Sequence, residues 1–485
     1  MAISINISDK NNASSSSKER TDMMANFKPD KKQVKVKKKP KKKLFILIIV
    51  GMIILIAALS MQRILNFSSD IGLKISANDL INPVKKDPTL TKDRTGKYTN
   101  ILLVGLDTRE TDAGLQNTDT MIVASYDHES HTMTMFSIPR DTYAKQPGSD
   151  NWFVKLNGIY NTAEQLESGS GLKTLKSVIE EYVDLEIQYY GLVDIQGFKN
   201  VIDILGGVEV YVENSFTDYF YPDEYIQNGY KVVSFEQGLQ NMDGDTAVKY
   251  VRSRKSSDNN EGSDFARARR QQQVIKAIYR KALSSETLLN PKKIVELLAE
   301  IQGNIQLSEF TNEDIQAALA IINKEEDVKM YSFVLDPYIG GLRRILSEGV
   351  VPDAYSIGPT LGLGQYEDLH TLIERIQKDP LIYSQDPLIY TYDIGIGYYE
   401  AAELTEKLQE KLPFIQIVYR GTMYSDKNAS YIYDNSLEGS FTSSVKKVVS
   451  TNKDLELNIE KPDFVQNRLN GEDITVMFGG EKSDE

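Results

Sequence analysis

Arginines and aspartates recur in this chain at points where predicted strands end and where one predicted helix begins. The first group is Asp107 with Arg109, the second is Asp119, and the third is Arg140 with Asp141. A guanidinium group donates two parallel hydrogen bonds to a phosphate or a carboxylate. Aspartates beside such arginines can share a divalent cation with the phosphate. These residues therefore predict a site for a phosphorylated ligand.

Two further arginines follow a helix that we predict over residues 243–251. They are Arg252 and Arg254, and the polar stretch after them, 255–262, is predicted to be a loop. Because the chain as a whole is acidic, with a net charge of −13, arginines gathered here are a local exception. Their position after a helix end is consistent with a place at the same site.

A long helix is predicted from Ser263 or Asp264 to about residue 283, with the polar cap that helix starts favour. Asp264, Arg267 and Gln271 fall on one face of it at spacings of three and four residues. The free N–H groups and the dipole of a helix start favour an anion. The apolar continuation of this face is predicted to pack in the core, with a slot for a lipid tail as the alternative.

The elements that must position these side chains are three strands. We predict strands over 100–104, 120–126 and 132–138, with a hairpin turn at 127–130 between the last two. A hairpin brings the start of one strand and the end of the next to the same edge, so Asp119 should meet the residues that follow Ile138. Asp107 reaches that edge if the first and third strands run parallel.

The N-terminal region predicts a membrane anchor. Nine lysines lie between residues 31 and 43, and the following run 44–61 has no charged residue. At about 1.5 Å per residue this run covers most of a bilayer core, and flanking lysines stay in the cytoplasm. We therefore predict a disordered cytoplasmic tail over 1–43, a single transmembrane helix over 44–62 and a stalk over 63–97, with the rest of the chain outside the cell. A signal peptide cleaved near Ala57–Ser60 is the alternative.

The composition excludes several kinds of chemistry. The chain has no cysteine, which removes thiol catalysis, disulfides and cysteine-ligated zinc. Of its three histidines, His128 and His131 are expected at a solvated hairpin tip rather than in a metal pair. Carboxylates are therefore the expected bases. Direct binding of nucleic acid is not expected of an acidic chain facing outside.

A few aromatic and basic residues stand apart from these motifs. Trp152 is expected to fill the core or a loop base, and Arg269 and Arg270 to be surface or packing residues. Ordinary packing is expected for a group of five tyrosines, with stacking on sugar rings as the alternative: Tyr211, Tyr219, Tyr221, Tyr225 and Tyr230.

The C-terminal third predicts a second folded unit. Residues 290–380 have a mostly helical pattern without recognisable chemistry. Beyond Pro387 we predict strands over 388–392, 414–419 and 473–478 and a helix over 399–412. The loop Gly395–Gly397 is interpreted as a tight turn between strand and helix, because it is too short for a phosphate-binding loop.

Several segments, in order, resemble motifs of the LytR-CpsA-Psr (LCP) family of cell-envelope proteins. They are Asn100–Arg109, Asp119–Met121, Ser137–Thr142, Asn200–Val210, Tyr250–Arg254 and Asp264–Gln272. The resemblance runs from about Tyr98 to residue 283, within a domain we place at 98–380. Residues 385–480 resemble, less sharply, the LytR C-terminal domain of some members.

The resemblance implies an α/β fold with a central mixed sheet and helices on both faces, preceded by the transmembrane helix and followed by a smaller α/β domain. It implies a phosphotransferase that moves a glycopolymer, such as teichoic acid or capsular polysaccharide, from a polyprenyl-pyrophosphate carrier to peptidoglycan. A non-catalytic envelope protein that binds polyprenyl lipids, of the kind once labelled transcriptional attenuators, is the alternative. A pyrophosphatase without transfer is a third possibility.

The resemblance also implies roles for the residues above. Asp107 and Asp119 would hold Mg²⁺, and the pyrophosphate would be gripped by Arg140, Arg252, Arg254 and Arg267. Asp264 and Gln271 would orient those arginines, and the resemblance gives no clear role to Asp141. Because the acceptor hydroxyl needs only a weak base, we expect Asp107 or Asp141 to serve as that base and place both with Arg140 in the catalytic group. Many members have an arginine where this chain has Asn117, so one pyrophosphate contact is expected either to be missing or to be supplied by another residue, with Arg109 as the candidate.

Overall fold

A computed structural model provides the structure of the chain. It describes residues 89–107, 117–149, 151–223, 229–282, 305–308, 328–339, 344–423, 430–435, 457–458 and 473–479, with scattered positions between 284 and 317. All of them belong to one compact unit, residues 43–485. The predicted tail over 1–43, the span over 44–62 and most of the stalk over 63–97 lie outside the described residues. Among the described helices, none is long and apolar enough to cross a bilayer.

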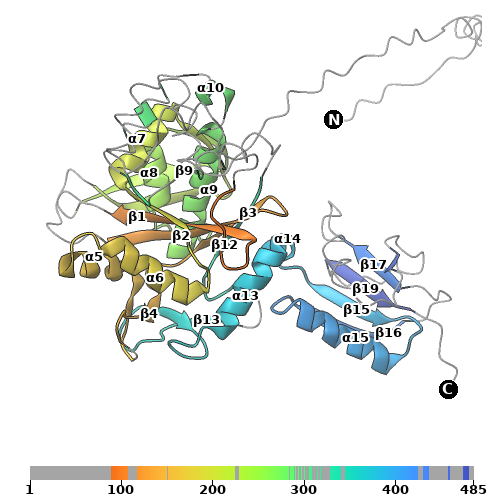
Figure 1. Cartoon of the computed structure of the whole chain (residues 1–485). Coiled ribbons are helices and arrows are strands. Elements are labelled where there is room, and N and C mark those ends of the chain that lie inside the picture. Colours follow the sequence, from red (N-terminus) through yellow and green to blue (C-terminus); the bar gives the residue numbers. More distant parts are fainter. Residues whose placement is uncertain are drawn as a thin grey trace, which may run out of the picture. The chain divides into compact units, whose positions relative to one another are not determined.

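A six-stranded mixed sheet forms the centre of the larger part (Figure 1). Its strands, in spatial order, are β11 (Ile305–Leu307), β6 (Tyr189–Asp194), β1 (Tyr98–Asp107), β2 (Asn117–Asp127), β3 (Thr132–Ser137) and β12 (Lys329–Val334). Strands β1, β2 and β3 form an antiparallel meander, so β1 and β3 run in the same direction. Asp107 was expected to reach the edge that holds Asp119 if these two strands were parallel. The backbone meets that expectation, because Asp107 lies opposite Asn117 at the start of β2.

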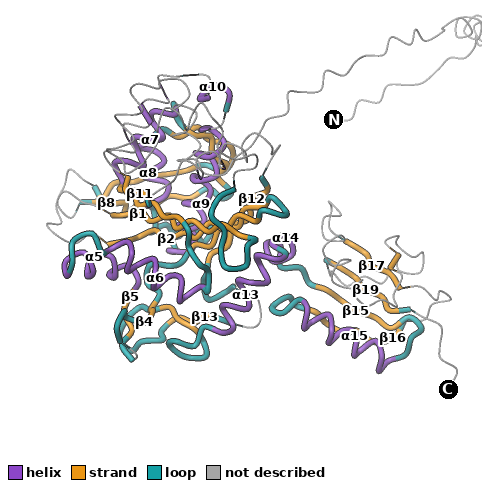
Figure 2. The backbone as a smooth tube through the Cα atoms, in the orientation of Figure 1, coloured by secondary structure: helices purple, strands orange, loops and turns teal. Residues whose placement is uncertain are grey.

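Helices cover both faces of this sheet, which confirms the predicted fold class for this part of the chain (Figures 1 and 2). On one face lie α5 (Leu156–Leu166), α6 (Gly171–Val183) and α13 (Glu367–Lys378), whose apolar side chains share a core cluster with Leu102 and Val123. On the other face lie α7 (Ile195–Leu205), α8 (Gly244–Arg252) and α9 (Asp264–Ala282). Successive side chains along β1 and β2 point to opposite faces of the sheet, so the same strands pack against helices on both sides.

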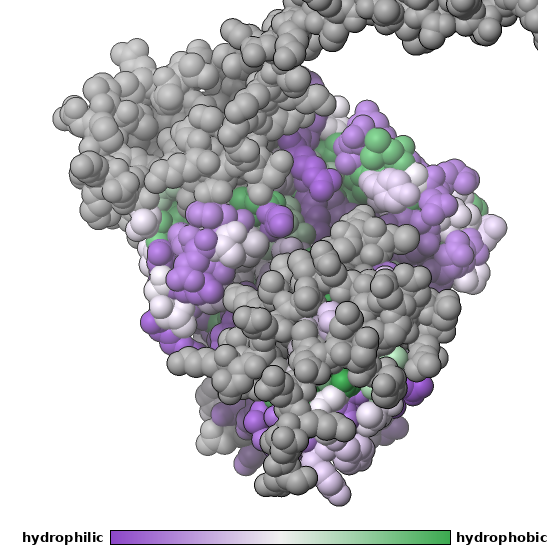
Figure 3. Space-filling model, turned by 90° about the vertical axis from the view of Figure 1, so that its right-hand side faces the viewer, coloured by the Kyte–Doolittle hydropathy of each residue, from purple (hydrophilic) through white to green (hydrophobic). Residues whose placement is uncertain are grey.

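Two antiparallel strand pairs complete the layer that contains α7 to α9. Strands β7 (Val208–Val212) and β10 (Gly238–Met242) form one pair, and β8 (Phe216–Pro222) and β9 (Tyr230–Phe235), which lie between them in the chain, form a hairpin. Their inward side chains join the same core cluster as α8 and α9. On the molecular face drawn in Figure 3, hydrophilic side chains cover most of the described surface and hydrophobic ones form small patches.

The expectation of a mostly helical pattern over 290–380 is wrong for the described residues. That stretch contains helix α13, and helix α14 (Pro380–Gln385) begins at its last residue. Its described residues also contain four strands: β11, β12, β13 (Leu346–Glu348) and β14 (Ile357–Pro359). The short α10 (Ser285–Leu288) precedes it. Strand β12 pairs in parallel with β3, so tertiary pairing decides its conformation.

A second, five-stranded sheet forms in the C-terminal part of the chain, in the order β16 (Ile417–Thr422), β15 (Ile389–Asp393), β19 (Ile474–Phe478), β17 (Ser430–Asp434) and β18 (Leu457–Asn458). Helix α15 (Tyr398–Lys411) packs on it. Asp393 accepts hydrogen bonds from the backbone N–H groups of Gly395 and Gly397 at 2.9 and 3.0 Å. Because both N–H groups donate to Asp393 within the loop, they do not point outward to bind a phosphate. The interpretation of this loop as a tight turn is therefore confirmed.

Candidate active site

The charged residues predicted from the sequence meet at one edge of the central sheet. Arg140 lies at their centre: its Nη1 is 2.8 Å from Asp119 Oδ2, its Nε is 3.4 Å from Asp141 Oδ2 and its Nη2 is 3.6 Å from Asp264 Oδ2. Arg267 Nη1 lies 3.3 Å from Asp264 Oδ1 and 3.8 Å from Asp119 Oδ2. Residues separated by almost 150 positions thus form one ion-pair network.

A β-bulge brings Asp119 into this network. Gly105 pairs with Thr120 and Leu106 pairs with Thr118, so Asp119 has no partner across the β1–β2 ladder. Regular alternation would place Asp119 on the same face as Met121, which packs in the core beneath α5 and α6. The extra residue re-aims the Asp119 side chain, and both Asp119 and Thr120 line the cavity on the opposite face.

Gly105 allows the two strands to approach closely beside the bulge. A Cβ atom at this position would lie 3.0 Å from Cβ of Thr120, which is tighter than most Cβ contacts in proteins. A larger residue would therefore require Thr120 to shift by a few tenths of an ångström at the point where Asp119 leaves the ladder. Gly105 thus favours the close approach of β1 and β2.

The start of α9 positions Asp264 and Arg267. Ser263 Oγ accepts a hydrogen bond from Ala266 N at 3.0 Å, so Ser263 caps the helix as predicted. More than two turns after this cap, Gln272 Nε2 donates to Ser137 Oγ at 2.8 Å and to the carbonyl of Phe333 at 2.9 Å. These two bonds hold α9 on strands β3 and β12, beside the end of β3 that precedes Arg140.

The pKa values of the two central arginines differ because their surroundings differ. Burial lowers the pKa of Arg140, but Asp119, Asp264 and Asp141 outweigh it and the net pKa is raised. For Arg267, whose side chain is 7% exposed, burial dominates and the pKa is lowered despite Asp264. A buried cation in this state is stabilised by any further anion that approaches it.

Several polar atoms of this network still lack hydrogen-bond partners. Within the described part of the chain, Nε of Arg140, Nε of Arg267 and Oδ1 of Asp264 are buried without one. Buried donors are rarely left unmatched in native proteins, since each costs about 1–3 kcal/mol. Nε of Arg140 faces Asp141 Oδ2 at 3.4 Å, whereas Arg267 also lines a cavity. An unmatched guanidinium N–H on a cavity-lining arginine is typical of a site that receives an anionic ligand.

Asp141 is held by two cations. Its Oδ1 is 2.6 Å from Lys155 Nζ at the end of strand β5 (Phe153–Lys155), and its Oδ2 faces Arg140. Strand β5 pairs with β4 (Tyr143–Lys145), and the Asp141 carbonyl accepts from Ile357 N at 3.1 Å. With both oxygens engaged, Asp141 holds Arg140 in place. Lys155 was missed in the sequence because a single lysine after a short strand carries no distinctive spacing.

The segment with Arg252 and Arg254 is held by two buried charged residues. The Asp218 carboxylate accepts from Ser253 Oγ, Arg254 N and Lys255 N at 2.6, 3.0 and 3.1 Å. These bonds lower the pKa of Asp218 although its burial opposes them. Sequence analysis missed Asp218, because it lies in a hairpin that was not predicted.

Arg270 holds the same segment from the other side. It is 2% exposed, and its guanidinium donates to the Glu261 carboxylate and to the carbonyls of Tyr250 and Ser253. It also lies over the ring of Phe216, 4.6 Å from the ring centre. The prediction of a packing residue is confirmed for Arg270, and its neighbour Arg269 is exposed.

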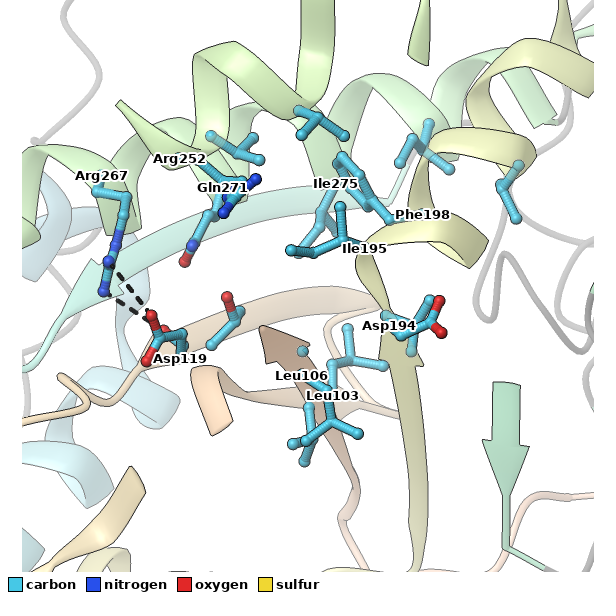
Figure 4. A pocket seen from close by; sticks show the side chains of 18 of the residues that line it. Leu103, Leu106, Asp119, Asp194, Ile195, Phe198, Arg252, Arg267, Gln271 and Ile275 are labelled. Atoms are coloured by element: carbon cyan, nitrogen blue, oxygen red, sulfur yellow. Dashed lines mark hydrogen bonds and ion pairs between the residues drawn. The ribbon is translucent and has the colours of Figure 1, made fainter. Parts of the chain in front are cut away.

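An elongated apolar cavity of about 480 Å³ leads away from the charged network, between the sheet and helices α7 to α9. Figure 4 shows Asp119 and Arg267 at one end, and Leu103, Ile195, Phe198 and Ile275 further along. Arg252, Arg254 and Gln271 also line it. The apolar face of α9 therefore lines a slot as well as the core, as the alternative interpretation of the sequence expected.

Some predicted site residues cannot be placed. Arg109 lies outside the described residues, and for Asp107 only the backbone is described. In the part of the chain that is described, no group of three or more acidic or histidine side chains could hold a metal ion. The proposed pair Asp107 and Asp119 thus remains a prediction, as does the contact expected from Arg109.

The exposed fractions of the aromatic side chains test the expectations for Trp152 and for the group of tyrosines. Trp152 is 66% exposed, so the expectation that it fills the core or a loop base is wrong. It lies just before β5, outside the apolar layers. Of the tyrosines, Tyr221 is buried, while Tyr211, Tyr219 and Tyr230 are more than half exposed, which contradicts ordinary packing for these three. Tyr225 is outside the described residues.

Comparison with known proteins gives relatives that are teichoic acid transferases. The chain is 30% identical over 219 residues to the polyisoprenyl-teichoic acid–peptidoglycan teichoic acid transferase TagV of Bacillus subtilis (strain 168), covering 45% of this chain and 52% of the relative. It is 34% identical over 208 residues to TagU of Oceanobacillus iheyensis, a transferase of the same name, covering 43% and 58%. The matched stretch thus spans little more than half of each relative.

A solved structure and a family model complete the comparison. The crystal structure of B. subtilis TagV aligns with 58% of this chain and 96% of its own, at 23% identity and a TM-score of 0.43. The model of the LytR_cpsA_psr family matches residues 68–338, more than half of the chain. By that match, the chain belongs to the LytR_cpsA_psr family.

Proposed function

We propose that this protein is a membrane-anchored phosphotransferase that attaches a glycopolymer to peptidoglycan outside the cell. The donor would be a glycan, such as teichoic acid or capsular polysaccharide, linked to a polyprenyl pyrophosphate. The observation that carries the proposal is the continuity of the arginine network with the apolar cavity. This arrangement fits a ligand with an anionic head and a long hydrocarbon tail.

The apolar part of the cavity fits the tail. Burial of hydrocarbon contributes about 0.8 kcal/mol per CH₂ group. Phe198 from α7 and Ile275 from α9 face the strand β1 across the cavity (Figure 4). The tail would then hold the pyrophosphate against Arg267, Arg252 and Arg254, which line the polar end.

The proposed reaction is the attack of an acceptor hydroxyl oxygen on the phosphorus attached to the glycan. The bond from that phosphorus to the bridging oxygen breaks, and polyprenyl phosphate leaves with the electron pair. Arg140 and Arg267 would stabilise the charge on the pyrophosphate oxygens, and Asp119 and Asp264 would hold these guanidinium groups in place. The hydroxyl proton passes to a carboxylate, for which Asp107 is our candidate because both oxygens of Asp141 are engaged.

The donor chemistry of the site fits Mg²⁺. Both arginine contacts to the Asp119 carboxylate go to its Oδ2, and Mg²⁺ in phosphoryl-transfer sites commonly takes one or two carboxylates together with substrate phosphates. We propose Asp119 and Asp107 as its ligands. When bound, Mg²⁺ would neutralise charge on the pyrophosphate.

The test uses the full chain with a polyprenyl-pyrophosphate-linked oligosaccharide, Mg²⁺ and peptidoglycan fragments, with products followed by mass spectrometry. Glycan phosphate on the fragments, lost with EDTA and in Asp119→Ala, is the expected result. Tight binding of the lipid without transfer to any acceptor would contradict the transferase and favour a lipid-binding regulator. Release of free glycan phosphate into water would favour a pyrophosphatase.

The location of the protein is part of the proposal. Nine lysines before an uncharged run support a cytoplasmic N-terminus and an extracellular site. Protease added to intact cells should then remove the folded part while leaving residues 1–43 protected. Full protection of the folded part would overturn this orientation.

A further inference from the structure

We propose that the hairpin formed by β8 and β9 docks on the membrane surface and opens the apolar cavity directly to the bilayer. The inference rests on the proposed function for the nature of the ligand in the cavity. It does not rest on turnover, so it is tested separately below.

The hairpin carries apolar side chains on both faces, and on the outward face they lie toward the turn, beyond the polar pair Thr217 and Ser234. Phe216, Val233 and Phe235 point into the core. On the outward side, Tyr219, Phe220, Tyr230 and Val232 are 57%, 57%, 62% and 60% exposed. An antiparallel hairpin with one face in water normally carries polar residues on that face. A cluster of exposed aromatic and aliphatic side chains on one hairpin is typical of an interaction surface.

The exposed side chains are continuous with the cavity. Phe220 and Tyr230 are exposed to solvent and also line the cavity. Their rings meet edge to face with centres 5.7 Å apart, in neighbouring positions across the β8–β9 pair. The same two rings therefore border the cavity and the outer surface, which places an opening of the cavity at this hairpin.

The occupant that fits this surface is a lipid bilayer. Tyrosine and phenylalanine side chains favour the boundary between headgroups and hydrocarbon, and Val232 adds an aliphatic contact that a sugar ring does not need. Lys255, at the cavity, and Lys231, which lies 5.6 Å from the centre of the Tyr221 ring, add positive charge that anionic headgroups attract.

Energetics favour docking over extraction of the ligand through water. Each CH₂ group of a lipid tail that crosses water costs about 0.8 kcal/mol. A cavity mouth embedded in the headgroup region lets the tail slide from hydrocarbon into the apolar cavity without that exposure. The anionic head would then travel toward Arg254 and Arg267 at the polar end.

The predicted anchor allows this contact. Residues 62–88 separate the apolar run from the first described residue. An extended chain reaches about 3.4 Å per residue, so this segment spans up to roughly 90 Å. That length lets the folded part turn the hairpin toward the bilayer.

The absence of cysteine from the chain permits a direct test. Tyr219→Cys and Val232→Cys each introduce a single thiol at an exposed position that does not line the cavity. The full chain, labelled there with an environment-sensitive fluorophore, is reconstituted into vesicles of phosphatidylcholine and phosphatidylglycerol that contain lipids brominated near the headgroup. The matched control is Leu166→Cys, 81% exposed at the end of α5 on the opposite side of the sheet.

We expect blue-shifted, quenched emission from the labels at positions 219 and 232 and unquenched emission from the label at 166. Unquenched labels at 219 and 232 would overturn the proposal, as would equal quenching at all three positions. If emission from the labels at 219 and 232 changes only when soluble peptidoglycan fragments are added, and not with brominated lipid, the surface binds glycan and the proposal is overturned. Quenching in a protein that shows no glycan transfer would retain the docking surface and reject the proposed function.

A second measurement uses activity. The double variant Tyr219→Ser/Val232→Ser leaves the charged network and the cavity lining intact. We expect its transfer from vesicle-embedded donor to fall about tenfold or more, the loss of roughly 1.4 kcal/mol of membrane affinity. Transfer from a short-chain, water-soluble donor should be unchanged, and equal losses with both donors would contradict docking.

Discussion

The carboxylate of Asp119 accepts a hydrogen bond from Arg140, with 2.8 Å between Oδ2 and Nη1, and the same oxygen faces Arg267 at 3.8 Å. Asp119 leaves the strand at a bulge, Arg140 follows the end of β3, and Arg267 comes from the first turn of α9. One carboxylate oxygen thus joins three elements. The geometry of the two guanidinium groups depends on all three.

Replacing Arg140 tests the centre of this network. Arg140→Ala removes the cation that Asp119, Asp141 and Asp264 surround, so glycan transfer should fall by roughly 10²–10³-fold. Arg140→Lys should restore only part of the rate, because an ammonium group lacks the two-pronged geometry. Initial rates with the lipid-linked oligosaccharide, and circular dichroism for folding, measure this. Arg269→Ala, exposed on α9, is the control, and a fully active Arg140→Ala protein would refute the site.

Replacing Arg270 tests how the Arg252–Lys255 segment is held. Arg270→Met leaves the Glu261 carboxylate buried without its cation, which should cost about 3–5 kcal/mol in the free energy of unfolding. Glu261→Gln in the same background should recover part of that loss, because it removes the unpaired charge. Urea unfolding of the single and double variants measures the coupling. Strictly additive losses would show that the two side chains do not interact.

Filling the cavity tests whether it holds a lipid tail. Ile275→Trp places a larger ring where α9 faces β1, and excluding two CH₂ groups of a tail costs about 1.6 kcal/mol, or roughly a tenfold weaker Kd. The expected result is a raised KM for a long-chain donor with little change for a short-chain donor. Arg280→Trp, exposed on the same helix, is the control. An unchanged KM for the long-chain donor would place the tail elsewhere.

His128 should make stability depend on pH. Burial, with a smaller effect of Lys92, lowers its pKa from 6.5 to about 4, and its Nε2 lies 2.8 Å from Thr99 Oγ1. Between these values the unfolded chain binds the proton more readily, so the free energy of unfolding decreases as pH falls from 6.5 toward 4. Since His128 is partly exposed, the total loss should be about 1–2 kcal/mol.

The variant His128→Gln isolates this contribution. Glutamine can still hydrogen-bond to Thr99 but does not titrate, so the difference in unfolding free energy between the variant and the parent should grow as pH falls through this window. Urea unfolding at several pH values between 4 and 7 measures it. A constant difference across the range would show that the pKa of His128 is not lowered in the folded protein.

Local signals in the sequence were sufficient for the hairpin from β2 to β3, the cap at Ser263 and the face of α9. Each depends on spacing within a few residues, which the chain itself encodes. The meeting of Asp119 with Arg140 also followed, because a hairpin places its outer ends at one edge. The parallel direction of β1 and β3 then depended on one further pairing, the antiparallel pairing of β1 with β2.

Other features follow from contacts between distant segments. Strand β12 is a strand because β3 pairs with it, and the hairpin β8–β9 and the pairing of β10 with β7 form because α8 and α9 cover their inner faces. Helix α5 was also missed, although Leu156, Ile159, Tyr160 and Ala163 have helical spacing in the sequence.

The chain by itself determined the kinds of charge at the site, the order of the motifs and the family, because residue types and short spacings carry that information. Only the tertiary structure decided that a bulge turns Asp119 toward the cavity, that Lys155 engages Asp141, and that Asp218 and Arg270 hold the segment between Arg252 and Lys255. These outcomes depend on backbone register and on burial, which arise when distant elements pack. Likewise, only the tertiary structure places the exposed rings of β8 and β9 at the border of the cavity.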